Sequence, residues 1–214
     1  ARANNLMSMF FEPLDVDAFT TGTVRVQGFS SDLHIDADMT LTDVTLWGEP
    51  FDTGRFRLVQ DRKHLTIEEF VVERNDGLGS AMMRGTRSDG INNFEVLVGG
   101  LPIDYLSWII DGKIPVRGKL DFLGTIQGEG FLPNGSLYIR DFWHGTHKLG
   151  HSQLLIHNQE EGLVIQGQLA DGITVKGVAG YSLEEDFAFD VDVDNFPIEA
   201  LYTLSLSEEA VEGT

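Results

Sequence analysis

Residues 94 to 106 read Phe-Glu-Val-Leu-Val-Gly-Gly-Leu-Pro-Ile-Asp-Tyr-Leu, and this stretch is the clearest guide to the fold. Apolar residues alternate up to a pair of glycines, as in a β-strand, and the chain restarts at Pro102. Residues 189 to 201 repeat the phrase as Phe-Asp-Val-Asp-Val-Asp-Asn-Phe-Pro-Ile-Glu-Ala-Leu, with Pro197 standing 95 residues after Pro102. A fainter copy surrounds Pro13, 89 residues before Pro102. The stretch therefore predicts a repeating unit.

Positions between these prolines recur at nearly the same spacing, as two copies of one supersecondary unit would require. The recurring residues are glycines, aromatic residues and members of alternating apolar segments. Pairs 96 residues apart are Gly22 and Gly118, Trp47 and Trp143, Gly54 and Gly150, and Leu58 and Leu154; pairs 95 apart are Gly77 and Gly172, Gly85 and Gly180, and Phe94 and Phe189.

This spacing divides the chain into repeats. We expect residues 13–101 and 102–196 to form two full copies, residues 1–12 to end a preceding repeat and residues 197–214 to begin a third. The chain opens just before one boundary and stops just after another, without a signal-peptide pattern. We interpret it as a fragment of a longer protein.

Segments between the glycines alternate between apolar and polar residues, which is the period of a β-strand. The clearest runs from Leu33 to Leu41, and it would span roughly 30 Å as a strand. Asp43 breaks its phase and Val44 resumes it, which predicts a β-bulge. Five further strands are expected in the first copy, at Gly22–Gly28, Gly54–Gln60, Leu65–Glu73, Ser80–Arg87 and Ile91–Gly99.

The strands follow one another at a spacing of about 8 to 12 residues, without room for crossover helices, which predicts an antiparallel meander. Pro102 to Ile110 is an exception, because proline suits the first position of a helix and apolar residues recur at helical spacing. Pro197 to Leu204 resembles it. The predicted fold is all-β, an elongated antiparallel sheet of repeats with short helices between them.

Composition excludes several functions. The chain has 214 residues and 42% hydrophobic content, enough to bury a core, and no apolar run approaches the roughly 18 residues of a membrane span. We therefore expect a soluble segment. A net charge of −19, with 15 scattered basic residues, argues against binding to nucleic acid or to anionic membrane surfaces. Without cysteine, disulfide and thiolate chemistry are excluded.

Two groups of residues resemble metal ligands. His144, His147 and His151 have the spacing of a zinc site on a helix, but intervening glycines argue against a helix, and we interpret the segment as a solvated loop. The run 190–194 of alternating aspartates resembles the start of a calcium loop but lacks its central glycine and its final glutamate. We interpret these aspartates as the polar side of a strand.

Catalytic signatures are absent. The sequence has no nucleophile elbow, phosphate loop or dinucleotide fingerprint, and the acidic pairs 68–69 and 184–185 are expected at strand starts or turns. We therefore predict no enzyme activity, no cofactor and no metal site.

The remaining candidate site is the apolar face of the strands. A second sheet would bury this face in an ordinary sandwich, whereas a sheet that curls around it in a stacked array would leave a groove suited to acyl chains. The residues expected to line the groove are Leu33, Ile35, Met39, Leu41, Val96, Val98, Leu120, Phe122, Ile126, Leu163, Ile165, Leu169, Ile173, Val175, Phe187, Phe189, Val191 and Val193.

Two further motifs accompany this pattern. The boundary motif Leu-Pro-Ile-Asp-Tyr-Leu at 101–106 has an echo, Phe-Pro-Ile-Glu-Ala-Leu, at 196–201. In the run 118–137, glycines and one proline recur in a Gly-x-Leu-x-x-x-Gly…Pro…Gly-x-Leu order. Together these motifs resemble the repeats of TamB and other AsmA-like proteins of diderm bacteria.

The resemblance implies a β-taco, a U-shaped sheet with a hydrophobic inner face. In that family the sheet is anchored in the inner membrane and crosses the periplasm to an outer-membrane barrel, TamA-like in the full-length protein, and carries glycerophospholipids between the membranes. Two alternatives stay open. One is a scaffold or chaperone segment whose edge strands pair with client strands during outer-membrane protein assembly, including that of autotransporters. The other is a closed-core adhesin repeat.

Overall fold

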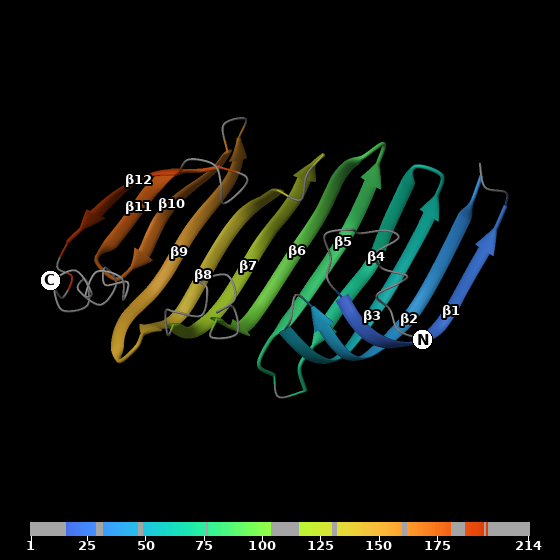
Figure 1. Cartoon of the computed structure of the whole chain (residues 1–214), viewed down its shortest axis with the longest axis horizontal. Helices are drawn as coiled ribbons and strands as arrows, with labels where there is room; N and C mark the ends of the chain where they lie inside the picture. Colours follow the sequence, from blue (N-terminus) through green and yellow to red (C-terminus); the bar gives the residue numbers. More distant parts are fainter. Residues whose placement is uncertain are drawn as a thin grey trace, which may run out of the picture. The chain divides into compact units, whose positions relative to one another are not determined.

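The computed structural model describes residues 16–28, 32–46, 49–75, 77–103, 116–129, 132–159, 162–180, 187–194 and 196. Within them, twelve strands form one open antiparallel sheet in the order of the sequence (Figure 1), which confirms the all-β class and the meander. The strands are β1 (Val16–Gln27), β2 (His34–Leu46), β3 (Glu49–Asp61), β4 (His64–Glu73), β5 (Ser80–Ser88), β6 (Ile91–Pro102), β7 (Val116–Gly128), β8 (Leu132–His144), β9 (His147–Gln159), β10 (Gly162–Ala170), β11 (Ile173–Ala179) and β12 (Phe187–Val193).

The strands predicted in the first copy are all present. The strand predicted at Leu33–Leu41 continues as β2 across the bulge predicted at Asp43. Asp43 has a φ of 49°, the register between β1 and β2 shifts beside it, and Leu41 and Val44 are both buried although they are three residues apart. This confirms the bulge.

The helix predicted from Pro102 is wrong at its first residue. Pro102 is the last residue of β6, where its missing N–H group ends the hydrogen-bonded ladder. Ile103, the next residue of that segment, has 3₁₀ conformation. Residues 104–110 and the similar segment 197–204 lie outside the described residues. Across the part that the structure describes, no helix is both long and apolar enough to cross a membrane.

The placement of Glu68 and Glu69 at a strand start or turn is also wrong. Both lie in the middle of β4, at a point where its registers with β3 and β5 shift. Glu68 Oε2 lies 3.3 Å from Arg57 Nη2, and Glu69 Oε2 lies 3.5 Å from Arg55 Nε. Both arginines also approach Asp38 on β2, at 3.4 and 3.5 Å. The acidic pair therefore belongs to an exposed network of ion pairs, and such pairs contribute little individually.

The chain divides into two compact units. The first unit comprises Ala1–Leu101 and Phe122–Pro133, and the second comprises Pro102–Asp121 and Asn134–Thr214. The main division falls between residues 101 and 102, where the sequence places a repeat boundary, although β7 contributes to both units.

Strand positions in the two predicted copies correspond. β2, β3 and β4 begin 98 residues before β8, β9 and β10 (132 − 34, 147 − 49, 162 − 64). Gly85 lies opposite Phe94 across β5 and β6, and Gly177 lies opposite Phe189 across β11 and β12, so that Gly177 takes the place predicted for Gly180. The repeat stays a prediction, because three of its reference residues lie outside the described ranges: Pro13, Trp47 and Pro197.

Candidate functional site

The apolar face of the first unit consists of rows that run across the strands. Opposite residues of an antiparallel pair point to the same side, so each register pair extends a row. Two of these rows are Met39, Phe56, Phe70, Met83 and Val96, and Ala37, Leu58, Ile67, Gly85 and Phe94.

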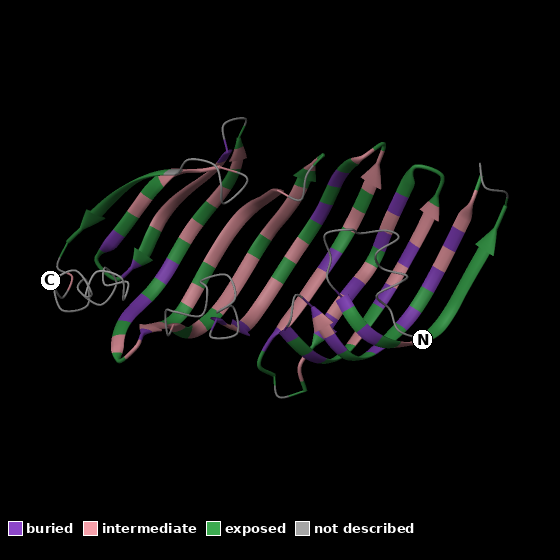
Figure 2. Ribbon diagram, in the orientation of Figure 1, coloured by how far each residue is buried: buried purple, intermediate pink, exposed green. Residues whose placement is uncertain are grey.

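This face of the first unit is closed over β2, β3 and β4, whereas Val24 and Val26 on β1 are exposed. Phe56 is 0% exposed, and its ring meets that of Phe70 edge to face, with 6.0 Å between centroids and 83° between planes. Buried positions recur along β2, β3 and β4 (Figure 2). Side chains with so little accessible surface have none left for contact with a ligand, so the first unit offers no groove along these rows.

The second unit has a face of the same kind on β8 to β12. Its members are aliphatic or aromatic residues interrupted by glycine. One row consists of Leu137, Leu154, Gly167, Val175 and Val191, and the next of Gly135, Ile156, Ile165, Gly177 and Phe189.

Two glycines shape these rows. A Cβ atom on Gly177 would lie 2.5 Å from Cδ1 of Phe189, so the phenyl ring covers the space that the glycine leaves on the neighbouring strand. Gly167 has a φ of 139°, and a Cβ atom there would lie 2.2 Å from the carbonyl oxygen of Gln153. Only glycine fits that position without displacing backbone.

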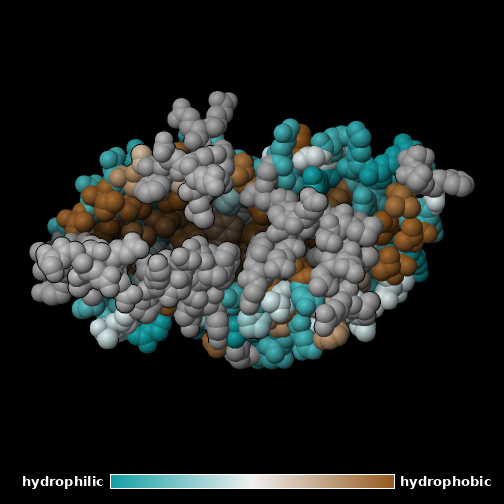
Figure 3. Space-filling view, in the orientation of Figure 1, coloured by the Kyte–Doolittle hydropathy of each residue, from teal (hydrophilic) through white to brown (hydrophobic). Residues whose placement is uncertain are grey.

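The face of the second unit is closed at one place and open at another. Leu149, Ala170 and Ile173 form a buried cluster, against which three partly buried residues pack: Phe142, Val175 and Phe196. On β12, by contrast, Val191 is 55% exposed and Val193 is 47% exposed. Figure 3 shows hydrophobic residues gathered over the C-terminal strands. The accessible part of the apolar face therefore lies on the β12 side.

The opposite side of these strands is polar, as the alternation predicts. Gln166, Lys176 and Asp190 lie opposite one another on β10, β11 and β12, and Asp192 follows on β12 opposite Thr174. This confirms that the aspartates form the polar side of a strand.

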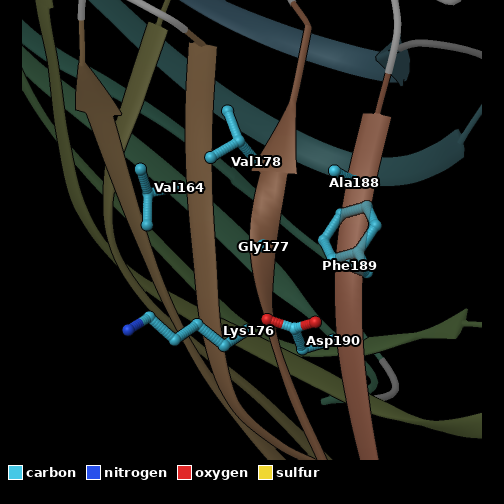
Figure 4. A pocket seen from close by; sticks show the side chains of 7 residues that line it. All are labelled: Val164, Lys176, Gly177, Val178, Ala188, Phe189 and Asp190. Carbon is cyan, nitrogen blue, oxygen red and sulfur yellow. The ribbon is translucent and has the colours of Figure 1, made fainter.

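A pocket of about 650 Å³ lies on β10 to β12 (Figure 4). Most of its lining comes from residues that share the polar side by register, with a small apolar island among them. The pocket shares Phe189 with the predicted groove, but most of its lining lies on the other side of the strands. Its lining residues are Val164, Lys176, Gly177, Val178, Ala188, Phe189 and Asp190.

The predicted lining residues of β2 and β6 lie on the apolar side. Ile35, Met39 and Leu41 are buried. Val96 and Val98 are half-buried and continue rows of the same face through β5. All five residues lie on the apolar side, as predicted. Ile35, Met39 and Leu41, however, are too enclosed to line an open groove.

Other predicted residues occupy less central places. Leu33 is half-buried and directly precedes β2. Leu120, Phe122 and Ile126 alternate on β7 and are half-buried. Phe187 begins β12 opposite Ala179.

In the second unit, the structure brings the predicted residues together with one exception. Ile165 and Val175 belong to neighbouring rows, and Leu163 and Ile173 lie on the same side. The even alternation expected from Leu163 to Leu169 is wrong, because the register shifts between Gln168 and Ala170. Ala170 takes the buried place opposite Ile173, and Leu169 is the extra, exposed residue of a bulge.

The prediction also missed residues of the apolar face. Leu154 and Ile156 of β9 alternate as clearly as the chosen residues, but only the register shows that they face Gly167 and Ile165. Phe56, at the centre of the first face, follows Gly54 at the expected period. Periodicity was the available signal in each case.

The histidine segment is a hairpin, not a solvated loop. His144 ends β8 and His147 opens β9, and Gly145 in the turn has a φ of 57°. His144 is buried, whereas His151 is exposed and its backbone N–H donates to Asp171 Oδ1 at 3.2 Å. In the described ranges, no three His, Asp or Glu side chains gather closely enough to hold a metal ion.

One exposed ion pair shifts the pKa values of its members. Arg62 Nε donates to Asp32 Oδ1 at 2.5 Å, joining the turn after β3 to the residues before β2. This hydrogen bond, together with the attraction between the charges, lowers the pKa of Asp32 below its ordinary value of 3.8 and raises the pKa of Arg62. Asp32 and Arg62 belong to the first unit and are not part of the apolar face of the second unit.

Comparison of the chain with protein-family models, with curated proteins and with solved structures gives no match.

Proposed function

We propose that the apolar face of the second unit binds the acyl chains of glycerophospholipids, and that the chain is one segment of a hydrophobic path across the periplasm. The observation that supports this is the pair of apolar rows on β9 to β12, whose members are half-buried or exposed. Acyl chains need no hydrogen-bond partner, and each methylene removed from water contributes about 0.8 kcal/mol. An apolar strip of this kind can therefore bind acyl chains without selecting among them.

The proposal is confined to the second unit. The residues that β2, β3 and β4 contribute to the rows of the first unit are buried, so a closed core describes that part of the first unit better. The closed-core alternative for the whole chain would need something to cover β12, and every described strand belongs to a single sheet. Because residues such as Phe56 are buried within the same sheet, the exposure of Val191 and Val193 is what argues for an open face in the second unit.

The resemblance to TamB and other AsmA-like proteins supplies the rest of the proposal. In a longer protein of that kind, an inner-membrane anchor would precede such segments and an outer-membrane barrel would receive the path. The scaffold alternative uses the same strands through their edges instead of their faces. It predicts binding of client strands without lipid.

Native mass spectrometry of the purified chain tests the proposal, with co-purified phospholipid as the readout. Ile165→Asp places a charge in the middle of an apolar row and should abolish lipid co-purification. Gln166→Asp, its neighbour on the polar side of β10, should leave lipid in place. Both substitutions add one negative charge at adjacent positions of β10. A difference in lipid binding between them therefore depends on the side of the strand on which the charge lies.

A photo-crosslinking residue offers an independent measurement. Placed at position 165 it should capture phospholipid, and placed at position 166 it should not. Equal capture at both positions, or absence of lipid from the unmodified chain, would contradict the proposal and favour a closed-core domain.

A further inference from the structure

The outermost strands of the described sheet, β1 and β12, each expose apolar residues. β1 pairs only with β2 among the described strands, and β12 pairs only with β11. Val24 and Val26 on β1 are 43% and 59% exposed, and they lie in register with the buried Ala37 and Ile35. On β12, Val191 has the corresponding position beside Val175. Long edge strands with exposed apolar residues are templates for pairing with another strand.

Each edge strand is antiparallel to its neighbour in the sheet, β1 to β2 and β12 to β11. A second copy that adds its β1 to β12 in the same manner places these two strands antiparallel to each other. The alternation of the meander would continue across the junction.

One register satisfies both sides of such a junction. If Val191 lies opposite Val24 of the second copy, Val193 lies opposite Gly22 and residue 189 opposite Val26, so the apolar rows continue. On the polar side the same register places Asp190 opposite Arg25, and Asp192 opposite Thr23. All positions of β12 from 188 to 193 then face residues of β1.

Charge supports this junction over the alternatives. Arg25 already lies opposite Asp36 on β2, and Asp190 lies opposite Lys176 on β11. Across the junction the polar row would read Asp36, Arg25, Asp190 and Lys176, with alternating sign. Two β12 edges would instead oppose acidic residues to acidic residues, and like charges directly opposite each other are destabilising.

We propose that β12 of one copy pairs with β1 of a second copy, head to tail, through Arg25 and Asp190. Such a contact joins two different surfaces, so each added copy brings a further β1 or β12 edge with which another copy can pair. The inference does not depend on lipid binding. Its test is made on lipid-free protein, so its failure would leave the proposed function untouched.

Sedimentation velocity over a range of concentrations, in about 0.15 M salt where the Debye length is about 8 Å, measures the association. The unmodified chain of 23.7 kDa should show average masses that rise steadily with concentration. Arg25→Glu and Asp190→Arg, each alone, should weaken association by roughly tenfold or more. Mixed in equal amounts, the two variants should associate again, because each supplies the edge that the other lacks.

Matched controls separate this contact from changes in net charge or folding. Lys119→Glu and Glu73→Arg carry the same charge changes away from both edges and should leave association unchanged. Asp192→Arg should weaken association less than Asp190→Arg, because residue 192 lies opposite the uncharged Thr23 in the proposed register. Recovery in the mixture also requires both variants to be folded. A chain that stays at 23.7 kDa at all concentrations, or variants that fail to associate when mixed, would overturn the inference.

Discussion

The two apolar faces should respond differently to the same substitution. Val72 on β4 is 0% exposed, whereas Val191 on β12 is more than half exposed. Replacing Val72 by Asp removes a buried side chain whose burial contributes about 1.5 to 3 kcal/mol, and it places a carboxyl group where water cannot reach it, at a further cost of several kcal/mol. The sum is a large share of the roughly 5 to 15 kcal/mol that stabilises a domain. We expect Val72→Asp to unfold the first unit or to cost about 4 kcal/mol.

Val191→Asp should cost about 1 kcal/mol or less, because its carboxylate stays in water and only strand preference and part of the apolar contact are lost. Urea unfolding followed by circular dichroism gives the loss of stability, and hydrogen exchange assigns the loss to β2–β6 or to β9–β12. Val71→Asp is the control, because residue 71 precedes Val72 on β4 and faces the polar side opposite Arg55. Equal losses for Val72→Asp and Val191→Asp would refute the distinction between a closed and an open face.

Three further predictions use other parts of the structure. Gly85→Ala should destabilise the first unit by about 1 to 3 kcal/mol in urea unfolding, since φ is 143° and a Cβ atom would lie 2.1 Å from the Asn93 oxygen, while Gly99→Ala should be nearly neutral. Adding a zinc chelator should leave the melting temperature unchanged, and a large fall would reveal a metal site at the β8–β9 hairpin. In an NMR titration, Arg62→Gln should raise the pKa of Asp32 toward 3.8. Because the folded-state pKa of Asp32 is lowered, the pair stabilises the fold above the unfolded-state value, and this contribution is lost as pH falls through the folded-state pKa.

Local pattern was enough to predict the strands and their two sides. Side chains alternate in any extended segment, so the period of two in Leu33 to Leu41 already separates the apolar side of β2 from the polar side. Glycine, asparagine and aspartate turns leave room only for short connections, which forces neighbours to be antiparallel. The phase change at Asp43 was visible for the same reason, because it interrupts a long and regular alternation.

Register required the tertiary structure. The bulges at Glu68 and Glu69 and at Leu169 each insert one residue relative to a neighbouring strand, and the sequence of one strand does not contain its partner's alignment. Pro102 was compatible both with the start of a helix and with the end of a strand, and the structure places it as the last residue of β6.

The sequence by itself determined an alternating, antiparallel, largely acidic all-β chain with one apolar face. Only the tertiary structure decided that this face is enclosed around Phe56 and open around Val191, although the residues on both are of the same kind. The reason is that alternation records which side of a strand is apolar, whereas burial depends on the atoms that other parts of the chain bring to that side.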